Sequence, residues 1–261
     1  MAKVPARVAA RITSALKRFQ PILAAAKARD VNESDTVVVV TDLLQEVFGY
    51  DKYADITSEH MIRSTFCDLA IKVASELQVL LEVKAIGLDL KDQHVKQAVD
   101  YAANQGAEWV GLTNGVQWRV YKVIFGKPLQ QELVVEFDLL AMNPKDAHDV
   151  EMLSLLAKES WTKAKLGEYA SLRQALSRFF LGAVVLSEPV LEVVRRELRR
   201  LNPDVRIGVD EIASALRSEV LKRDVIEGES AELARRQVAR AASRRLRSAG
   251  EDAPAVREPN A

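Results

Sequence analysis

Glu82 and Lys84 lie among apolar residues near the start of the stretch LLEVKAIGLDL, residues 80–90. Alternate side chains of a strand point to the same face of its sheet, so Glu82 and Lys84 would lie together while Leu81 and Val83 point the other way. Such a charged pair is most often part of a solvated strand face. A carboxylate beside a lysine can also hold a hard cation and stabilise charge on a phosphate, which is the chemistry of metal-assisted hydrolysis.

A second acid meets Glu82 if the preceding strand folds back on this one. The strand-like segments STFCDLAIKV and LQVLLEVKAIG are separated by Ala74, Ser75 and Glu76. With these three residues as the loop, Val73 pairs with Leu77, and counting back puts Asp68 directly opposite Glu82. Because the loop contains no glycine, a register slipped by one residue is the alternative.

Two opposed carboxylates repel each other and need a proton, a cation or a nearby base. Mg²⁺ is the expected counter-charge, with Mn²⁺ as the alternative ion, because Mg²⁺ prefers oxygen ligands and needs few from the protein. Lys84 would project beside the ion, where it could orient or help deprotonate a water or stabilise a phosphate. Asp68, Glu82 and Lys84 together therefore fit phosphodiester hydrolysis, and three charged residues on a solvated sheet face remain the alternative.

The elements around this set predict a mixed α/β domain. Residues 32–51 contain four consecutive valines, but their apolar positions fall on one helical face, so we expect a helix between a cap at Asn32 or Ser34 and Gly49. Helical spacing recurs over 91–106. Strands are expected on either side of Asn114-Gly115, a strong two-residue hairpin signal. The order helix, strand, strand, helix, strand, strand predicts a sheet covered by helices.

The chain divides into four regions on composition and periodicity. Residues 1–30 predict an amphipathic helix, 31–140 the α/β domain, 146–248 an all-helical region, and 249–261 a disordered tail rich in Pro, Ala and charge. Helical spacing within the third region covers 171–186, 188–202, 209–225 and 230–248.

Composition limits the classes of function. The net charge is +0, so any nucleic-acid contact must use a local patch. One cysteine, Cys67, cannot form an internal disulfide, and with three scattered histidines it makes no zinc site. We expect a cytoplasmic protein without a transmembrane segment or a membrane partner, since the basic start lacks the apolar core of a secretory signal. An organelle transit peptide is the alternative interpretation of that start.

The motif Glu82-Val83-Lys84 after Asp68 resembles the PD-(D/E)xK nuclease signature. The wider segment 32–123 strongly resembles the N-terminal nuclease domain of type I restriction enzyme R subunits. The phrase LTNGVQWRVYKV and the run Gln97-Ala98-Val99-Asp100-Tyr101 carry the likeness more specifically than the short motif. The resemblance implies a restriction-endonuclease-like fold and cleavage of DNA in restriction or defence.

The resemblance also implies roles for individual residues. Asp68 and Glu82 would bind the metal with the Val83 carbonyl as third ligand, Lys84 would be the catalytic lysine, Glu33 would complete the site, and Gln97 and Tyr101 would form the Q-x-x-x-Y motif beside it. The spacing of His94, Gln97 and Tyr101 independently puts these three on one helix face. Cys67 stands where the signature has proline, and we expect it to be a buried small residue. No phosphate-loop motif or room for a motor domain accompanies the match.

Several surfaces allow more than one interpretation. Trp109, Trp118 and Tyr121 are expected to pack in the sheet core rather than stack on nucleobases. Arginines crowd residues 195–200 and 235–247, where DNA contact and solvated or partner-binding helices are equally favoured. The competing functions are a catalytically silent nucleic-acid-binding or scaffold protein that acts with partner subunits, and a regulatory protein whose helical region binds a partner.

Overall fold

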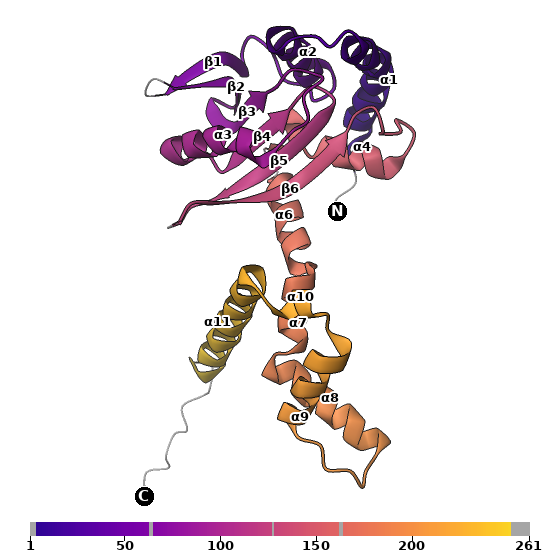
Figure 1. The fold of residues 1–261 in the computed structure, drawn as a ribbon, viewed down its shortest axis with the longest axis vertical. Helices are drawn as coiled ribbons and strands as arrows, with labels where there is room; N and C mark the ends of the chain where they lie inside the picture. The colour runs from indigo at the N-terminus through magenta and orange to yellow at the C-terminus, as the bar shows by residue number, and fades with distance from the viewer. Residues whose placement is uncertain (1–3, 63–64, 127, 162–163, 252–261) are drawn as a thin grey trace, which may run out of the picture. The chain divides into compact units, whose positions relative to one another are not determined.

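A computed structural model describes residues 4–62, 65–126, 128–161 and 164–251 (Figure 1). The chain forms two compact units, Met1–Ala170 and Ser171–Ala261. The first is a mixed α/β unit built on one sheet and the second is helical, so the predicted fold class is confirmed. Among the described residues, no helix is both long and apolar enough to span a membrane.

Six strands form the sheet in the order in which they occur along the chain. They are β1 (Ile56–Ile62), β2 (Thr65–Val73), β3 (Glu76–Val83), β4 (Trp109–Thr113), β5 (Gln117–Ile124) and β6 (Gln130–Asp138). All neighbours are antiparallel except β3 and β4, which run parallel and are connected through α3 (Asp92–Gln105). The predicted strand pairs are present, and the structure adds β1 and β6 at the two edges.

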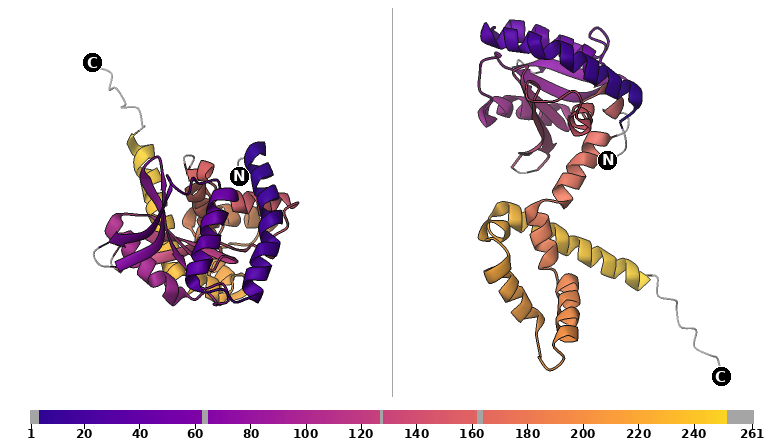
Figure 2. Two further views of the ribbon diagram at one scale, coloured as in Figure 1. Left: turned by 90° about the horizontal axis from the view of Figure 1, so that it is seen from above. Right: turned by 90° about the vertical axis from the view of Figure 1, so that its right-hand side faces the viewer.

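Helices cover both faces of the sheet (Figure 2). The amphipathic helix α1 (Ala6–Ala28) and α2 (Glu33–Glu46) contribute to the cluster that contains Leu81 and Val83 of β3. Helix α3 contributes to a second cluster with Leu80, the neighbour that points to the opposite face. The helix predicted within 32–51 is present, although it ends at Glu46 rather than near Gly49. The Asn32 side chain caps α2 by accepting the backbone N–H of Asp35 at 2.9 Å.

The β2–β3 hairpin differs from the prediction at its turn. The loop is the two residues Ala74 and Ser75, both with positive φ (52° and 68°), and Val73 pairs with Glu76 rather than Leu77. A register shift between Ile71 and Lys72 then adds one residue to β3, so that Leu69 pairs with Leu81. The three-residue loop was therefore wrong, but the bulge offsets the error and brings Asp68 beside Glu82.

The remaining helices follow the sheet. They are α4 (Ala147–Ser154), α5 (Lys158–Trp161), α6 (Lys165–Ala175), α7 (Arg178–Val185), α8 (Glu188–Leu201), α9 (Val209–Ala215), the π-helix η1 (Leu216–Val220), α10 (Arg223–Ile226) and α11 (Glu229–Glu251). Helices α4 and α5 belong to the first unit, and α6 crosses into the second.

Two of the predicted long helices are interrupted. The single helix over 171–186 is wrong because Ser177 ends α6 and caps α7, accepting the N–H of Phe180 at 3.3 Å. The helix over 209–225 is divided by η1 and an extended Leu221. Helix α11 takes in residues 249–251, and the rest of the predicted tail, 252–261, lies outside the described residues.

Candidate functional site

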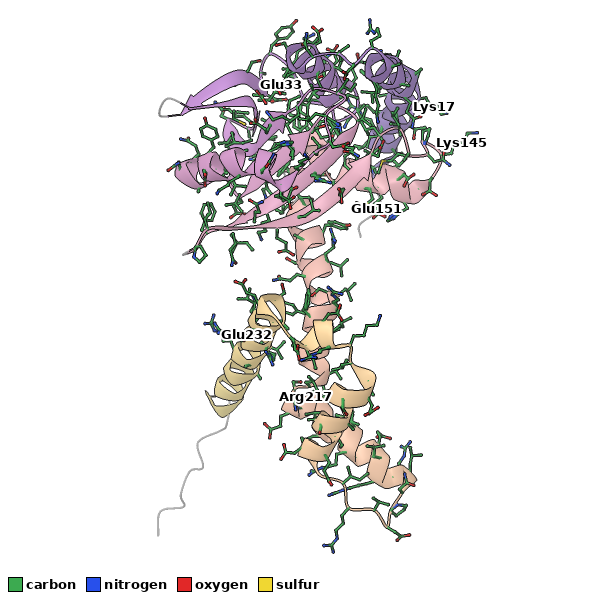
Figure 3. The ribbon with its side chains drawn as sticks, viewed as in Figure 1. Lys17, Glu33, Lys145, Glu151, Arg217 and Glu232 are labelled. Atoms are coloured by element: carbon green, nitrogen blue, oxygen red, sulfur yellow. The ribbon has the colours of Figure 1, made fainter. Side chains whose placement is uncertain are left out.

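Lys84 lies between two carboxylates from different elements. Its Nζ donates a hydrogen bond to Glu82 Oε1 at 2.7 Å and lies 3.5 Å from Glu33 Oε2. Glu33 is the first residue of α2, placed there by the Asn32 cap, and Figure 3 labels it where that helix begins. The fold thus brings together three of the predicted site residues from segments about 50 positions apart in sequence.

Asp68 reaches from β2 to the end of β3. Its Oδ2 accepts the backbone N–H of Val83 at 2.7 Å, which fixes the carboxylate next to the residue whose carbonyl was expected to bind a metal. The charge of Asp68 is close enough to raise the pKa of Glu82. The structure thus places Asp68 beside Glu82 and Val83.

Glu82 is a buried carboxylate with one unsatisfied oxygen. Only 6 % of the residue is exposed, and Oε2 is buried without a hydrogen-bond partner among the described atoms. Burial raises the pKa of Glu82, and the Lys84 hydrogen bond opposes that shift, while the charges of Asp68 and Glu33 add to it. A buried acceptor without a donor is destabilising, so Oε2 is a position where a cation would be favourable.

Lys84 is held in its charged form. Burial acts to lower its pKa, but the hydrogen bond and charge of Glu82, with the charges of Glu33 and Asp68, outweigh that effect and raise it. At neutral pH the side chain is therefore an ammonium. In this state Lys84 is suited to stabilising negative charge or orienting a water, and it has no lone pair with which to act as a base.

A divalent ion at this site would have few side-chain ligands. In the described parts of the chain, no group of three or more His, Cys, Asp and Glu side chains is arranged to hold a metal. An ion at this position would have two carboxylates, from Asp68 and Glu82, and the Val83 carbonyl, with water completing its shell. That donor set is all oxygen and fits Mg²⁺, which usually keeps several waters.

Two of the predicted residues of helix α3, His94 and Tyr101, have described side chains with different surroundings. Tyr101 is buried in the cluster with Leu80, and its hydroxyl has no hydrogen-bond partner among the described atoms. His94 caps its own helix, where Nδ1 accepts the N–H of Lys91 at 3.2 Å. The side chain of Gln97 lies outside the described residues. Tyr101 therefore faces the sheet rather than solvent.

Cys67 precedes Asp68 and is fully buried, as expected. Burial, together with the charges of Glu82 and Asp68, raises the pKa of its thiol to about 12. A thiol with this pKa stays protonated, so Cys67 is not a nucleophile.

Asn114 is a site residue that the sequence identified only as part of a turn. It is buried, its Nδ2 donates to the Leu88 carbonyl at 2.9 Å, and its Oδ1 accepts the N–H groups of Val116 and Gln117 at 3.1 and 2.7 Å. The neighbouring Thr113 carbonyl accepts the N–H of Lys84 at 2.8 Å. The β4–β5 turn therefore fixes both Lys84 and the loop that follows it.

Replacing Asn114 with alanine is expected to lower the free energy of unfolding by about 1–3 kcal/mol, because buried backbone groups lose their partners. Urea unfolding followed by tryptophan fluorescence measures this. The control is Asn104→Ala, since Asn104 is exposed and bonds only within its own helix to the Asp100 carbonyl. Equal stability of the two variants would contradict the anchoring role.

The family comparison covers this site. The family model described as Type I restriction enzyme R protein N terminus matches residues 38–135. The match includes β1 to β5, α3 and most of β6, and leaves out Glu33, α1 and the second unit. Comparison with curated proteins and with solved structures gave no match. The segment 38–135, which carries Asp68, Glu82, Lys84 and Asn114, is thus similar to the N terminus of type I restriction enzyme R proteins.

Proposed function

We propose that this protein is a metal-dependent deoxyribonuclease of the PD-(D/E)xK type, acting in the cytoplasm in restriction or defence against foreign DNA. The observation that best supports this is the placement of Lys84 between Glu82 and Glu33, beside a buried carboxylate oxygen that lacks a donor. A protein that only binds DNA has no need for this arrangement, because it costs stability in the metal-free state.

Each residue has a defined task in this proposal. Asp68, Glu82 and the Val83 carbonyl would hold Mg²⁺, or Mn²⁺ as the alternative. When bound, the ion supplies Lewis acidity toward the phosphate and lowers the pKa of a coordinated water. Lys84 donates from its ammonium to a phosphate oxygen or to the water, which stabilises charge that develops during cleavage. Glu33 keeps the ammonium charged and directed into the site.

A second candidate is a catalytically silent protein with the same fold, acting as a nucleic-acid-binding or scaffold subunit. The observation that favours it is the hydrogen bond between Asp68 Oδ2 and the Val83 N–H, which occupies one oxygen of an expected ligand. In this candidate, Asp68 serves to pin β2 to the end of β3.

Cleavage assays separate the two candidates. Plasmid, linear and single-stranded DNA are incubated with the protein and Mg²⁺ or Mn²⁺, beside Asp68→Asn, which keeps shape but removes the charge. We expect cleavage that stops with EDTA and falls by roughly a hundredfold in the variant. Asp204→Asn, at an exposed loop residue of the second unit, is the control. Tight binding without cleavage under every condition would favour the silent protein, and equal cleavage by Asp68→Asn would reject the metal site.

A further inference from the structure

The two units use different basic side chains. Of the Lys and Arg residues in Met1–Ala170, 14 are lysine and 6 are arginine, whereas Ser171–Ala261 has 16 arginines and 1 lysine. Both units belong to one chain, so a general bias toward arginine cannot account for the difference. Arginine presents a planar fork of donors that matches phosphate geometry, and lysine does not. The use of arginine rather than lysine in the second unit therefore indicates a binding role in addition to keeping the protein soluble.

The arginines of α11 are concentrated where acids are absent. Six arginines fall within residues 235–247, here called the arginine segment, and no acid occurs between Glu232 and Glu251. Within the segment, Arg235, Arg236 and Arg240 are exposed. Of these three, Arg236 forms an ion pair with Glu232, 3.3 Å away on the preceding turn.

Helix α8 provides the contrast within the same unit. It also carries four arginines, at 195, 196, 199 and 200, but acids alternate with them. Arg195 pairs with Glu192 at 2.5 Å, and Arg196 and Arg200 lie 3.7 and 3.2 Å from Glu197. The charge of α8 is therefore largely compensated by acids within its own sequence, whereas the arginine segment contains no acid.

Packing leaves the described arginines at the start of the arginine segment accessible within their unit. Helix α11 packs on α7 near its start, where Ala231 and Ala234 are buried. The exposed Arg236 and Arg240 lie one turn apart, on the side opposite Ala234 by helical periodicity. Figures 1 and 2 show the later part of α11 extending from α7 with no other described helix of this unit beside it. The segment is roughly 18 Å long at 1.5 Å per residue, and the major groove of DNA is wide enough for an α-helix.

We propose that the arginine segment of α11 binds the phosphate backbone of double-stranded DNA and so holds the substrate of the nuclease proposed above. The partner is identified by charge complementarity, since a dense row of arginines without acids fits a polyanion of regular phosphate spacing. The contacts are to phosphates and carry no sequence preference. Calling this DNA a substrate rests on the nuclease function proposed above. The binding of DNA by α11 does not depend on cleavage.

The test compares two triple variants of the full chain. Arg235→Gln, Arg236→Gln and Arg240→Gln together remove three charges from α11, and Arg195→Gln, Arg196→Gln and Arg200→Gln remove three from α8. Glutamine retains helix propensity close to that of arginine. Binding to a fluorescein-labelled duplex is measured by anisotropy in EDTA over a range of salt concentrations, with circular dichroism as the check on folding.

We expect the α11 variant to bind duplex DNA at least about tenfold more weakly at low salt, and its plot of log affinity against log salt to be shallower by up to about 3. The α8 variant should bind like the wild type. A variant with lysine at the same three α11 positions should keep most of the salt dependence, because it retains the charge.

Other outcomes would overturn the assignment. Equal losses in both triple variants would show that binding follows net charge, and no loss in either would place DNA binding elsewhere. Tighter binding of single-stranded RNA or polyglutamate than of duplex DNA would reject the named partner. Cleavage by the wild type with unchanged binding by the α11 variant would reject this inference alone. Duplex binding through α11 without any cleavage would reject only the nuclease.

Discussion

Lys84→Ala is expected to lower the rate of DNA cleavage by about a hundred- to a thousandfold, the cost of removing one well-placed donor from a site of developing charge. The ammonium of Lys84 is fixed by Glu82 and Glu33, and its raised pKa keeps it charged through the neutral range. Single-turnover cleavage of a supercoiled plasmid at saturating protein and Mg²⁺ measures the rate without a contribution from product release.

Two further variants make the result specific. Lys145→Ala removes a charge from an exposed lysine of the same unit, labelled in Figure 3, and should cleave like the wild type. Lys84→Arg keeps the charge on a longer, planar group and should recover only part of the rate. If Lys84→Ala stays folded by circular dichroism and cleaves at the wild-type rate, Lys84 has no catalytic role and its ion pair with Glu82 serves stability.

Trp118→Ala is expected to lower the free energy of unfolding of the first unit by about 3–5 kcal/mol. Trp118 is buried, its ring centroid lies 5.3 Å from that of Phe48 and 6.2 Å from that of Phe137, and its indole N–H donates to the Gly115 carbonyl at 3.1 Å. The truncation would therefore leave a cavity between α2 and the sheet. The two remaining tryptophans, Trp109 and Trp161, lie in the same unit, so fluorescence during urea unfolding reports on it.

Trp118→Phe is the matched control, because it keeps an aromatic ring and loses the hydrogen bond. It should lower the free energy of unfolding by about 1–2 kcal/mol. DNA affinity measured where both variants are folded should equal that of the wild type. A loss of DNA affinity in Trp118→Ala with little change in stability would instead assign this ring to nucleobase stacking, the interpretation that its burial opposes.

The central part of the fold could be predicted because local signals agree with it. In α2, helical spacing of apolar residues and the Asn32 cap outweighed the strand propensity of four valines, and burial of one face of that helix explains why. Asp68 met Glu82 as expected, although through a two-residue turn and a bulge. Burial of Leu69 and Leu81 on one face fixes that register more strongly than the turn does.

The features that the sequence did not predict lack such local signals. The edge strands β1 and β6 contain many polar residues, and only pairing with β2 and β5 reveals them. The break at Ser177 depends on a cap inside a continuous apolar pattern. Asn114 looked like a turn residue because its bond to Leu88 crosses 26 positions of chain, which no local pattern encodes. The burial of Tyr101 similarly follows from how α3 packs on the sheet.

The parallel pair β3–β4 sets an order for folding. Strands β1 to β3 and strands β4 to β6 each form a meander of neighbours that can pair locally, and within the described sheet the two halves are joined by the parallel pair. That pairing must close a loop that includes α3, so it is entropically slower than the hairpins. Asp68 and Glu82 come from the first half, while Thr113 and Asn114, which hold Lys84 and its loop, come from the second. The acids can thus meet early, but the backbone of Lys84 and the loop that follows it are held in place only when the two halves dock.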